Sequence, residues 1–154
     1  MLARPVDDGG SSEPGVDALA LRFRLFPEIA SRAASEGTLE LIDASTEIFM
    51  ARRRVGTVAE LCRLDAEFWL LLSEAVSDGP ERDAVRGVLG DLADHAQWYL
   101  VAVVAESRAT LQMGRLIGAI RSADAPRAGR AATGLLATGL QAAMESFSPT
   151  FDHR

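Results

Sequence analysis

Asp65 and Trp69 stand out in the segment LDAEFW, part of the longer run VAELCRLDAEFWLLLSEAVSD. Residues four apart lie on one face of a helix, so both side chains project toward the same neighbouring elements. The rest of that face is apolar, and a carboxylate there is costly unless it is paired or used in chemistry. Asp65 is therefore the first candidate for a functional or ion-paired residue.

The other polar residues suggest little catalysis. The only histidines are His95 and His153, and His153 lies within the last two residues, where chains fray. The sequence has no glycine-rich phosphate loop, no paired-cysteine metal spacing and no HExxH motif. For the basic triplet Arg52–Arg54, a solvated helix end is favoured over a nucleic-acid contact. We expect neither an enzyme nor a cofactor-binding protein.

The composition is typical of one globular domain. Of the 154 residues, 48% are hydrophobic and 25% are charged, and the net charge is −6, which argues against direct binding to a phosphate backbone. Apolar runs are shorter than the ~20 residues that span a bilayer. We read no signal peptide, and the single Cys62 cannot form an internal disulfide. A cytoplasmic protein without membrane contact is expected.

Helical periodicity continues from about Val16 to Phe147, without the alternation of strands. Thr57 and Glu60 form a capping box at one predicted helix start, and Pro27 is expected to bend or break the first helix. The predicted helices cover 16–35, 39–53, 57–76, a stretch from 80 through 103, 107–122 and 126–147. These ranges predict an all-α antiparallel bundle of about six or seven helices. Residues 1–15 and 148–154 are expected to be tails around a domain spanning 16–147.

Three segments resemble the FCD effector domain of FadR-type regulators in the GntR family. ALALRFRLFPEIASRAASEGT resembles the first helix, VAELCRLDAEFWLLLSEAVSDGP an LD-containing segment, and LIGAIRSADAPRAGRAATGLL the closing segment. They occur in the family's order and cover about 16–147. The resemblance implies a ligand-sensing homodimer that contacts DNA only through an N-terminal winged helix. This chain lacks a winged helix, so it is either a fragment of a longer regulator or a stand-alone domain.

Many FCD domains hold a divalent metal with one Asp and three His. The resemblance places the Asp at Asp65, whereas the three His positions fall at Trp69, at about Met113 and at about Leu135. A lone carboxylate without imidazole makes a poor transition-metal site. We therefore expect no metal, and we expect Asp65 to pair with Arg22 of the first matching segment.

Apolar side chains at the former metal positions imply a largely apolar effector pocket. The resemblance matches the run from Gly134 to Gln141 with the effector-contacting last helix of the family, and the glycines in this run would allow the effector to approach closely. The candidate pocket residues are Arg22, Asp65, Trp69, Met113, Ile117, Gly134, Leu135 and Gln141. The expected effector is a hydrophobic carboxylate or an acyl thioester, because a metal-free member of the family binds acyl-coenzyme A. Alternatively, these side chains fill the space, and the chain is a helical oligomerisation module without an effector.

Overall fold

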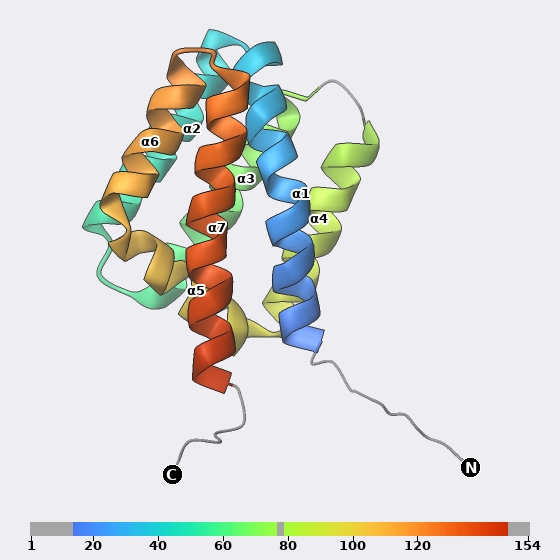
Figure 1. The fold of residues 1–154 in the computed structure, drawn as a ribbon, viewed down its shortest axis with the longest axis vertical. Coiled ribbons are helices and arrows are strands. Elements are labelled where there is room, and N and C mark those ends of the chain that lie inside the picture. The colour runs from blue at the N-terminus through green and yellow to red at the C-terminus, as the bar shows by residue number, and fades with distance from the viewer. Residues whose placement is uncertain (1–13, 77–78, 148–154) are drawn as a thin grey trace.

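A computed structural model describes residues 14–76 and 79–147 of the chain, and within these ranges every regular element is a helix. The elements are α1 (Pro14–Glu36), α2 (Leu39–Ala51), the short 3-10 helix η2 (Arg52–Arg54), α3 (Val58–Glu74), α4 (Gly79–Asp94), α5 (Ala96–Arg108), α6 (Thr110–Arg121) and α7 (Ala125–Phe147) (Figure 1). The predicted all-α bundle of about six or seven helices is confirmed.

The two long helices α1 and α7 lie side by side and run antiparallel (Figure 1). α7 also packs against α5 and α6, whereas α1 packs against α4 on its other side. α2 packs mainly against α3. The first and last helices thus form a central pair with one face exposed, and the other helices lie beside and behind this pair in Figure 1.

Threonine side chains define the starts of α2 and α3. The Thr38 Oγ1 accepts a hydrogen bond of 3.2 Å from the backbone N–H of Leu41. Thr57 Oγ1 likewise accepts a 3.2 Å bond from the N–H of Glu60. Each bond satisfies one of the N–H groups that a helix start leaves without a partner. The predicted helix start at Thr57 is confirmed.

One predicted helix is wrong, and the break that was one of two outcomes expected at Pro27 does not occur. The segment expected as one helix from residue 80 through 103 divides at His95 into α4 and α5, where the His95 φ and ψ are −128° and 57°. Conversely, α1 continues through Pro27 without a break. Phe26, Ile29 and Ala30 next to the proline are fully buried, so packing holds the helix where the lost hydrogen bond weakens it.

Smaller differences concern the helix ends. α1 begins at Pro14, so two of the residues expected as a tail belong to the helix. The helix expected over 39–53 ends at Ala51 and tightens into η2. The tail predicted at 148–154 and most of the tail predicted at 1–15 lie outside the described residues.

The core is continuous through the bundle. Its large, fully buried apolar side chains come from α1, α2, α3, α4, α6 and α7: Leu19, Phe26, Ile29, Phe49, Phe68, Trp69, Leu72, Leu92, Leu116, Ile120 and Leu135. Within the described ranges, no helix has both the length and the apolar character needed to cross a membrane. A group of charged side chains lies inside this core, and it forms the first part of the candidate site.

Candidate functional site

Asp65 lies on the buried face of α3, and its side chain is fully inaccessible. The guanidinium of Arg22 on α1 reaches it, with 3.1 Å between Nη2 and Oδ2 and 3.3 Å between Nη2 and Oδ1. Arg22 is itself 1% exposed. The ion pair that the sequence predicts between these two residues is therefore present.

The same arginine also holds Glu106, a buried carboxylate on α5. Arg22 Nη1 donates to Oε2 of Glu106 at 2.6 Å, and Nη2 donates to Oε1 at 2.8 Å. Two parallel hydrogen bonds of this kind match the fork of a guanidinium to a carboxylate. Arg22 thus links α3 to α5 from its position on α1.

Arg52 and Tyr99 complete the surroundings of Asp65. Arg52 Nη1 donates to Oδ1 at 3.1 Å, and the Tyr99 hydroxyl donates to Oδ2 at 2.5 Å. Arg52 is 3% exposed, so its interpretation as part of a solvated helix end is wrong, because η2 turns this side chain against α3. We call these five residues, Arg22, Arg52, Asp65, Tyr99 and Glu106, the central ion cluster.

Gly139 on α7 gives Glu106 its space. A Cβ added at Gly139 would overlap Oε2 of Glu106, and it would lie 2.8 Å from the carboxyl carbon Cδ and 3.0 Å from the carbonyl oxygen of Ala102. Any larger residue would therefore displace either the glutamate or the helix. Glycine at 139 lets α7 pack directly over a buried ion pair.

The two carboxylates of the central ion cluster respond differently to burial. Burial by itself raises the pKa of Asp65, but the charges of Arg22 and Arg52 outweigh it and hold that pKa below 3.8, the ordinary value. For Glu106, burial dominates over the attraction of Arg22 and raises the pKa above 4.5. Asp65 faces two arginines, whereas Glu106 is hydrogen-bonded to one.

The central ion cluster offers more hydrogen-bond donors than acceptors. Nε of Arg22, together with Nε and Nη2 of Arg52, is buried and has no hydrogen-bond partner among the residues that the structure describes. Burial raises the pKa of Tyr99 well above 10, and the negative charge of Asp65 raises it further. Paired guanidinium groups and a protonated tyrosine supply no nucleophile, so the cluster is suited to fixing helices in place.

Trp69 and Leu135 occupy two of the positions where the FCD resemblance places metal-binding histidines, and both lie in apolar surroundings. Trp69 is 1% exposed, and its ring lies 4.8 Å from that of Phe26 and 5.1 Å from that of Phe68, measured between centroids. Leu135 is equally buried in α7. Within 14–76 and 79–147, no three His, Cys, Asp or Glu residues are grouped as a metal site would require.

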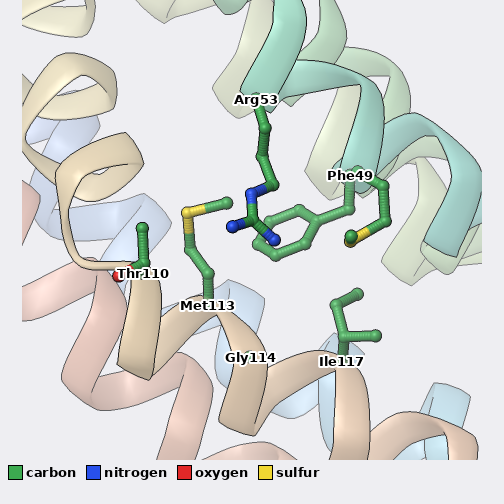
Figure 2. Close-up of a pocket in the computed structure, with 7 residues that line it drawn as sticks. Phe49, Arg53, Thr110, Met113, Gly114 and Ile117 are labelled. Carbon is green, nitrogen blue, oxygen red and sulfur yellow. The ribbon is translucent and has the colours of Figure 1, made fainter.

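An apolar cleft lies between α2 and α6, next to this core. Its volume is about 180 Å³, and its lining residues are Phe49, Met50, Arg53, Thr110, Met113, Gly114 and Ile117. Figure 2 shows the side chains of Phe49, Met113 and Arg53 pointing toward one another across it. The α2–α6 cleft therefore combines hydrocarbon and sulfur walls with one guanidinium.

Phe49 belongs both to the cleft and to the surroundings of the central ion cluster. The guanidinium carbon of Arg52 lies 5.0 Å from the centroid of its ring, a distance at which cation and ring attract. On its other side, the ring of Phe68 lies 4.7 Å away. A displacement of Phe49 would thus change the surroundings of Arg52, which donates a hydrogen bond to Asp65.

The predicted pocket residues consequently fall into four places. Arg22 and Asp65 belong to the central ion cluster, whereas Trp69 and Leu135 lie in the packed core. Met113 and Ile117 line the α2–α6 cleft. Gly134 is near Gln112 on the surface between α6 and α7, and the exposed Gln141 donates a hydrogen bond to Glu145.

Comparisons with models of protein families, with curated proteins and with solved structures find no match to this chain. The residues themselves therefore carry the functional argument.

Several residues of the site were missed from the sequence. Glu106 lies in the stretch VAVVAESR, where a carboxylate in an apolar helical run gives the same signal as Asp65. Tyr99 could be placed on a buried face by its spacing, but not beside Asp65. The spacing of Phe49 predicts a buried face, and Arg53 belongs to the basic triplet predicted as a solvated helix end. Neither pattern predicts a cleft, because a cleft between two helices depends on how those helices pack.

Proposed function

We propose that this chain is the effector-binding and dimerisation domain of a FadR-like transcription regulator, and that its effector is a small hydrophobic carboxylate. The α2–α6 cleft supports this proposal, because its apolar walls end at the guanidinium of Arg53. An apolar pocket with one well-placed polar group is the usual design of a small-molecule site. A carboxylate group would pair with Arg53 while the hydrocarbon part contacts Phe49 and Met113.

The volume of the cleft sets the size of the ligand. About 180 Å³ is slightly more than the engineered cavity of ~150 Å³ that takes up benzene. An aromatic ring or a short branched chain fits such a space, whereas the acyl thioester suggested by the family resemblance needs more room. Benzoate, phenylacetate and branched short-chain carboxylates are therefore the first ligands to test.

Phe49 supplies a route from the ligand to the rest of the domain. A ligand against its ring would shift the balance between arrangements of Arg52, and Arg52 binds Asp65 together with Arg22 of α1. The ligand changes the regulator only if it binds one helix arrangement more tightly than the other. In the proposed regulator, α1 would pass the change to the DNA-binding domains of the dimer.

Two substitutions test the cleft directly. Gly114→Leu would fill it, and a Cβ at this position meets no heavy atom within 4 Å, so the helix tolerates the change. Arg53→Gln removes the guanidinium, and Arg54→Gln is the matched control, because Arg54 belongs to the same 3-10 helix but does not line the cleft. Binding is measured by calorimetry and by the rise in melting temperature on adding ligand.

We expect the wild-type protein and Arg54→Gln to bind one of these carboxylates with equal affinity. Gly114→Leu should abolish binding, and Arg53→Gln should weaken it about 10-fold, which corresponds to the loss of one charged hydrogen bond. The proposal fails if no carboxylate binds the wild-type protein, or if Gly114→Leu binds as the wild type does.

A helical oligomerisation module is the second candidate, and the filled core around Trp69 and Leu135 favours it. The surface offers an apolar groove between α5 and α7, lined by Leu100, Val101 and Val104 among others. Native mass spectrometry of protein purified from its own host separates the two candidates. A dimer that carries no small molecule, from a protein that binds none of the carboxylates, would favour the module.

A further inference from the structure

Three arginines surround a hollow on the surface formed by α6 and α7. Arg115 comes from α6, whereas Arg127 and Arg130 come from the beginning of α7, and together with Ala131 they line a space of about 340 Å³. All three arginines are exposed. We call this group the arginine hollow.

The arginine hollow carries an excess of positive charge on an acidic chain. Arg127 faces Asp124, with 3.8 Å between Nη1 and Oδ2. Among the described residues, no carboxylate lies within ion-pairing distance of Arg115 or Arg130. Three positive charges and one negative charge leave a net charge of +2, on a chain whose overall net charge is −6.

Three other exposed arginines are held in ion pairs. Arg63 pairs with Glu60 and Glu67 on its own helix. Arg86 pairs with Asp83, and Arg121 pairs with Asp43. Other exposed arginines of the described ranges also have no ion pair: Arg24, Arg53, Arg54 and Arg108. Arg115 and Arg130 differ from these in that they line one hollow together with Arg127.

The position of the arginine hollow also opposes the helix dipole. Arg127 lies in the first turn of α7 and Arg130 in the second. Within the described part of the chain, the one carboxylate at this helix start is that of Asp124, whose Oδ1 accepts a hydrogen bond of 3.2 Å from the backbone N–H of Arg127, so one negative charge faces three positive charges. The beginning of a helix carries partial positive charge, so cations there are unfavourable, and the guanidinium groups repel one another. A bound anion would relieve both effects.

We propose that the arginine hollow binds a small anion with two or more negative charges on phosphoryl oxygens, such as the diphosphate part of a metabolite. Guanidinium groups bind phosphoryl oxygens with two parallel hydrogen bonds. The volume of about 340 Å³ accommodates a diphosphate. This site uses none of the residues that line the α2–α6 cleft, so it stands apart from the proposed carboxylate effector.

A nucleic-acid backbone fits the arginine hollow less well. In Figure 1, α7 begins at the end of the bundle opposite to the start of α1, where a preceding DNA-binding domain would join. A net charge of +2 can neutralise only about two phosphates, and binding to a duplex draws its strength from many such contacts. A small multivalent anion needs only this one hollow.

Pyrophosphate is the probe, and calorimetry and melting temperature are the measurements, with sulfate at equal ionic strength as the reference. The double variant Arg115→Gln with Arg130→Gln removes the unpaired charges, and Arg86→Gln is the control, since Arg86 is an exposed arginine on α4. We expect pyrophosphate to bind the wild type and Arg86→Gln with one site per chain. Binding should be at least 10-fold weaker in the double variant.

The melting temperature without pyrophosphate tests whether the arginines of the hollow repel one another. We expect the double variant in chloride to melt at the temperature of the wild type or above it, because removing unpaired like charges relieves repulsion. The proposal is overturned if pyrophosphate raises the melting temperature no more than sulfate does, or equally in all three proteins. It is also overturned if a DNA duplex binds through these arginines more tightly than pyrophosphate. Carboxylate binding in the α2–α6 cleft should be unchanged by the double variant, so each proposal can fail without the other.

Discussion

A charged aspartate can stay in the core of this protein because its negative charge is matched from several directions. Asp65 accepts hydrogen bonds from Arg22, Arg52 and Tyr99 and has no exposed surface. Moving a charge out of water is costly, and only good geometry with neighbouring charges and donors offsets that cost. A buried ion cluster adds little stability compared with well-packed apolar side chains in the same place, but the loss of one member leaves the other charges buried and unpaired.

Replacing Asp65 tests this account. We expect Asp65→Ala to lower the free energy of unfolding by ~3–5 kcal/mol, because two buried arginines would lose their shared carboxylate. Asp83→Ala is the control, since Asp83 is 79% exposed and pairs with an exposed arginine, so its loss should be within about 1 kcal/mol. Urea unfolding measures both values. Equal losses in the two variants would mean that the central ion cluster does not hold the fold together.

The pH dependence of stability tests the second carboxylate. The pKa of Glu106 is higher in the folded protein than its ordinary value of 4.5, so the folded state holds the proton more tightly than the unfolded chain. Glu106 therefore contributes stability that is complete below about pH 4.5 and is lost as the pH rises through the raised pKa. Asp65 has the opposite sign, because its pKa is lowered and its contribution is lost as the pH falls below about 3.8.

We expect the wild-type protein to lose stability from pH 4.5 upward, and Glu106→Gln to lose less over the same range, because glutamine cannot ionise. Urea unfolding at intervals from pH 4.5 to 8 measures the difference. A curve for Glu106→Gln parallel to that of the wild type would show that Arg22 cancels the effect of burial on Glu106.

Sequence reasoning reached part of this site for a clear physical reason. Asp65 could be identified because a lone carboxylate in an apolar helical stripe must be paired or used, and Arg22 was the nearest candidate in the resembling segments. Arg52 could not be placed, because a run of three arginines after a helix has the composition of a solvated end. Its burial follows from the tight turn of η2 against α3, which is a property of packing and not of local composition.

At the scale of helices, glycine decides how closely α7 approaches α5. Gly139 is the position where the two helices meet over Glu106, and a side chain there would enter the space of the carboxylate. Gly134 lies in the segment that the resemblance matches with an effector-contacting helix. A Cβ added at Gly134 would meet only the side-chain amide of Gln112 within 4 Å, at 3.8 Å. Of these two glycines, Gly139 is therefore the one at which α7 closely approaches another helix, and the close approach of an effector to this segment stays a prediction.

We expect Gly139→Ala to destabilise the protein by about 2–4 kcal/mol, because displacing Glu106 breaks its pair with Arg22 while alanine returns ~1 kcal/mol of helix propensity. Gly118→Ala is the matched control on α6, since an added Cβ there meets nothing within 4 Å. It should stabilise by ~0.5–1 kcal/mol. Thermal or urea unfolding of both variants gives the comparison.

A double variant identifies the cause. If Gly139→Ala acts by displacing Glu106, adding Glu106→Ala should cost much less in the Gly139→Ala background than in the wild type, because the pair is already broken. Additive losses would point to another contact of α7, such as the carbonyl of Ala102.

The helices themselves were predictable because their apolar residues repeat with the period of a helix, and that period is a local property. The division at His95 was not, since the chain has neither proline nor glycine there. α4 packs against α1, whereas α5 packs against α7, so the chain must change direction between them. That requirement comes from the bundle and leaves no sign in the local pattern.

For the whole molecule, the net charge determines whether the chain can bind DNA without a separate DNA-binding domain. The net charge is −6, because 22 Asp and Glu residues outnumber 16 basic residues. Several of the arginines are also held in buried or surface ion pairs. An acidic domain of this kind repels a DNA duplex at long range. The proposed regulator would therefore depend on a separate domain to reach DNA, and this chain would sense the ligand.

We expect the 154-residue chain alone to show no sequence-specific DNA binding at physiological salt. Binding by proteins to duplex DNA rises steeply as salt is lowered, with a slope set by the number of phosphates contacted. Fluorescence anisotropy with a labelled duplex at about 20 mM and about 150 mM salt measures both the affinity and its dependence on salt. The double variant Arg115→Gln with Arg130→Gln shows whether weak binding at low salt arises in the arginine hollow. A protected site on DNA at the higher salt would overturn the assignment of this chain as the ligand-sensing part of a regulator, because it would place the reading of sequence on these helices.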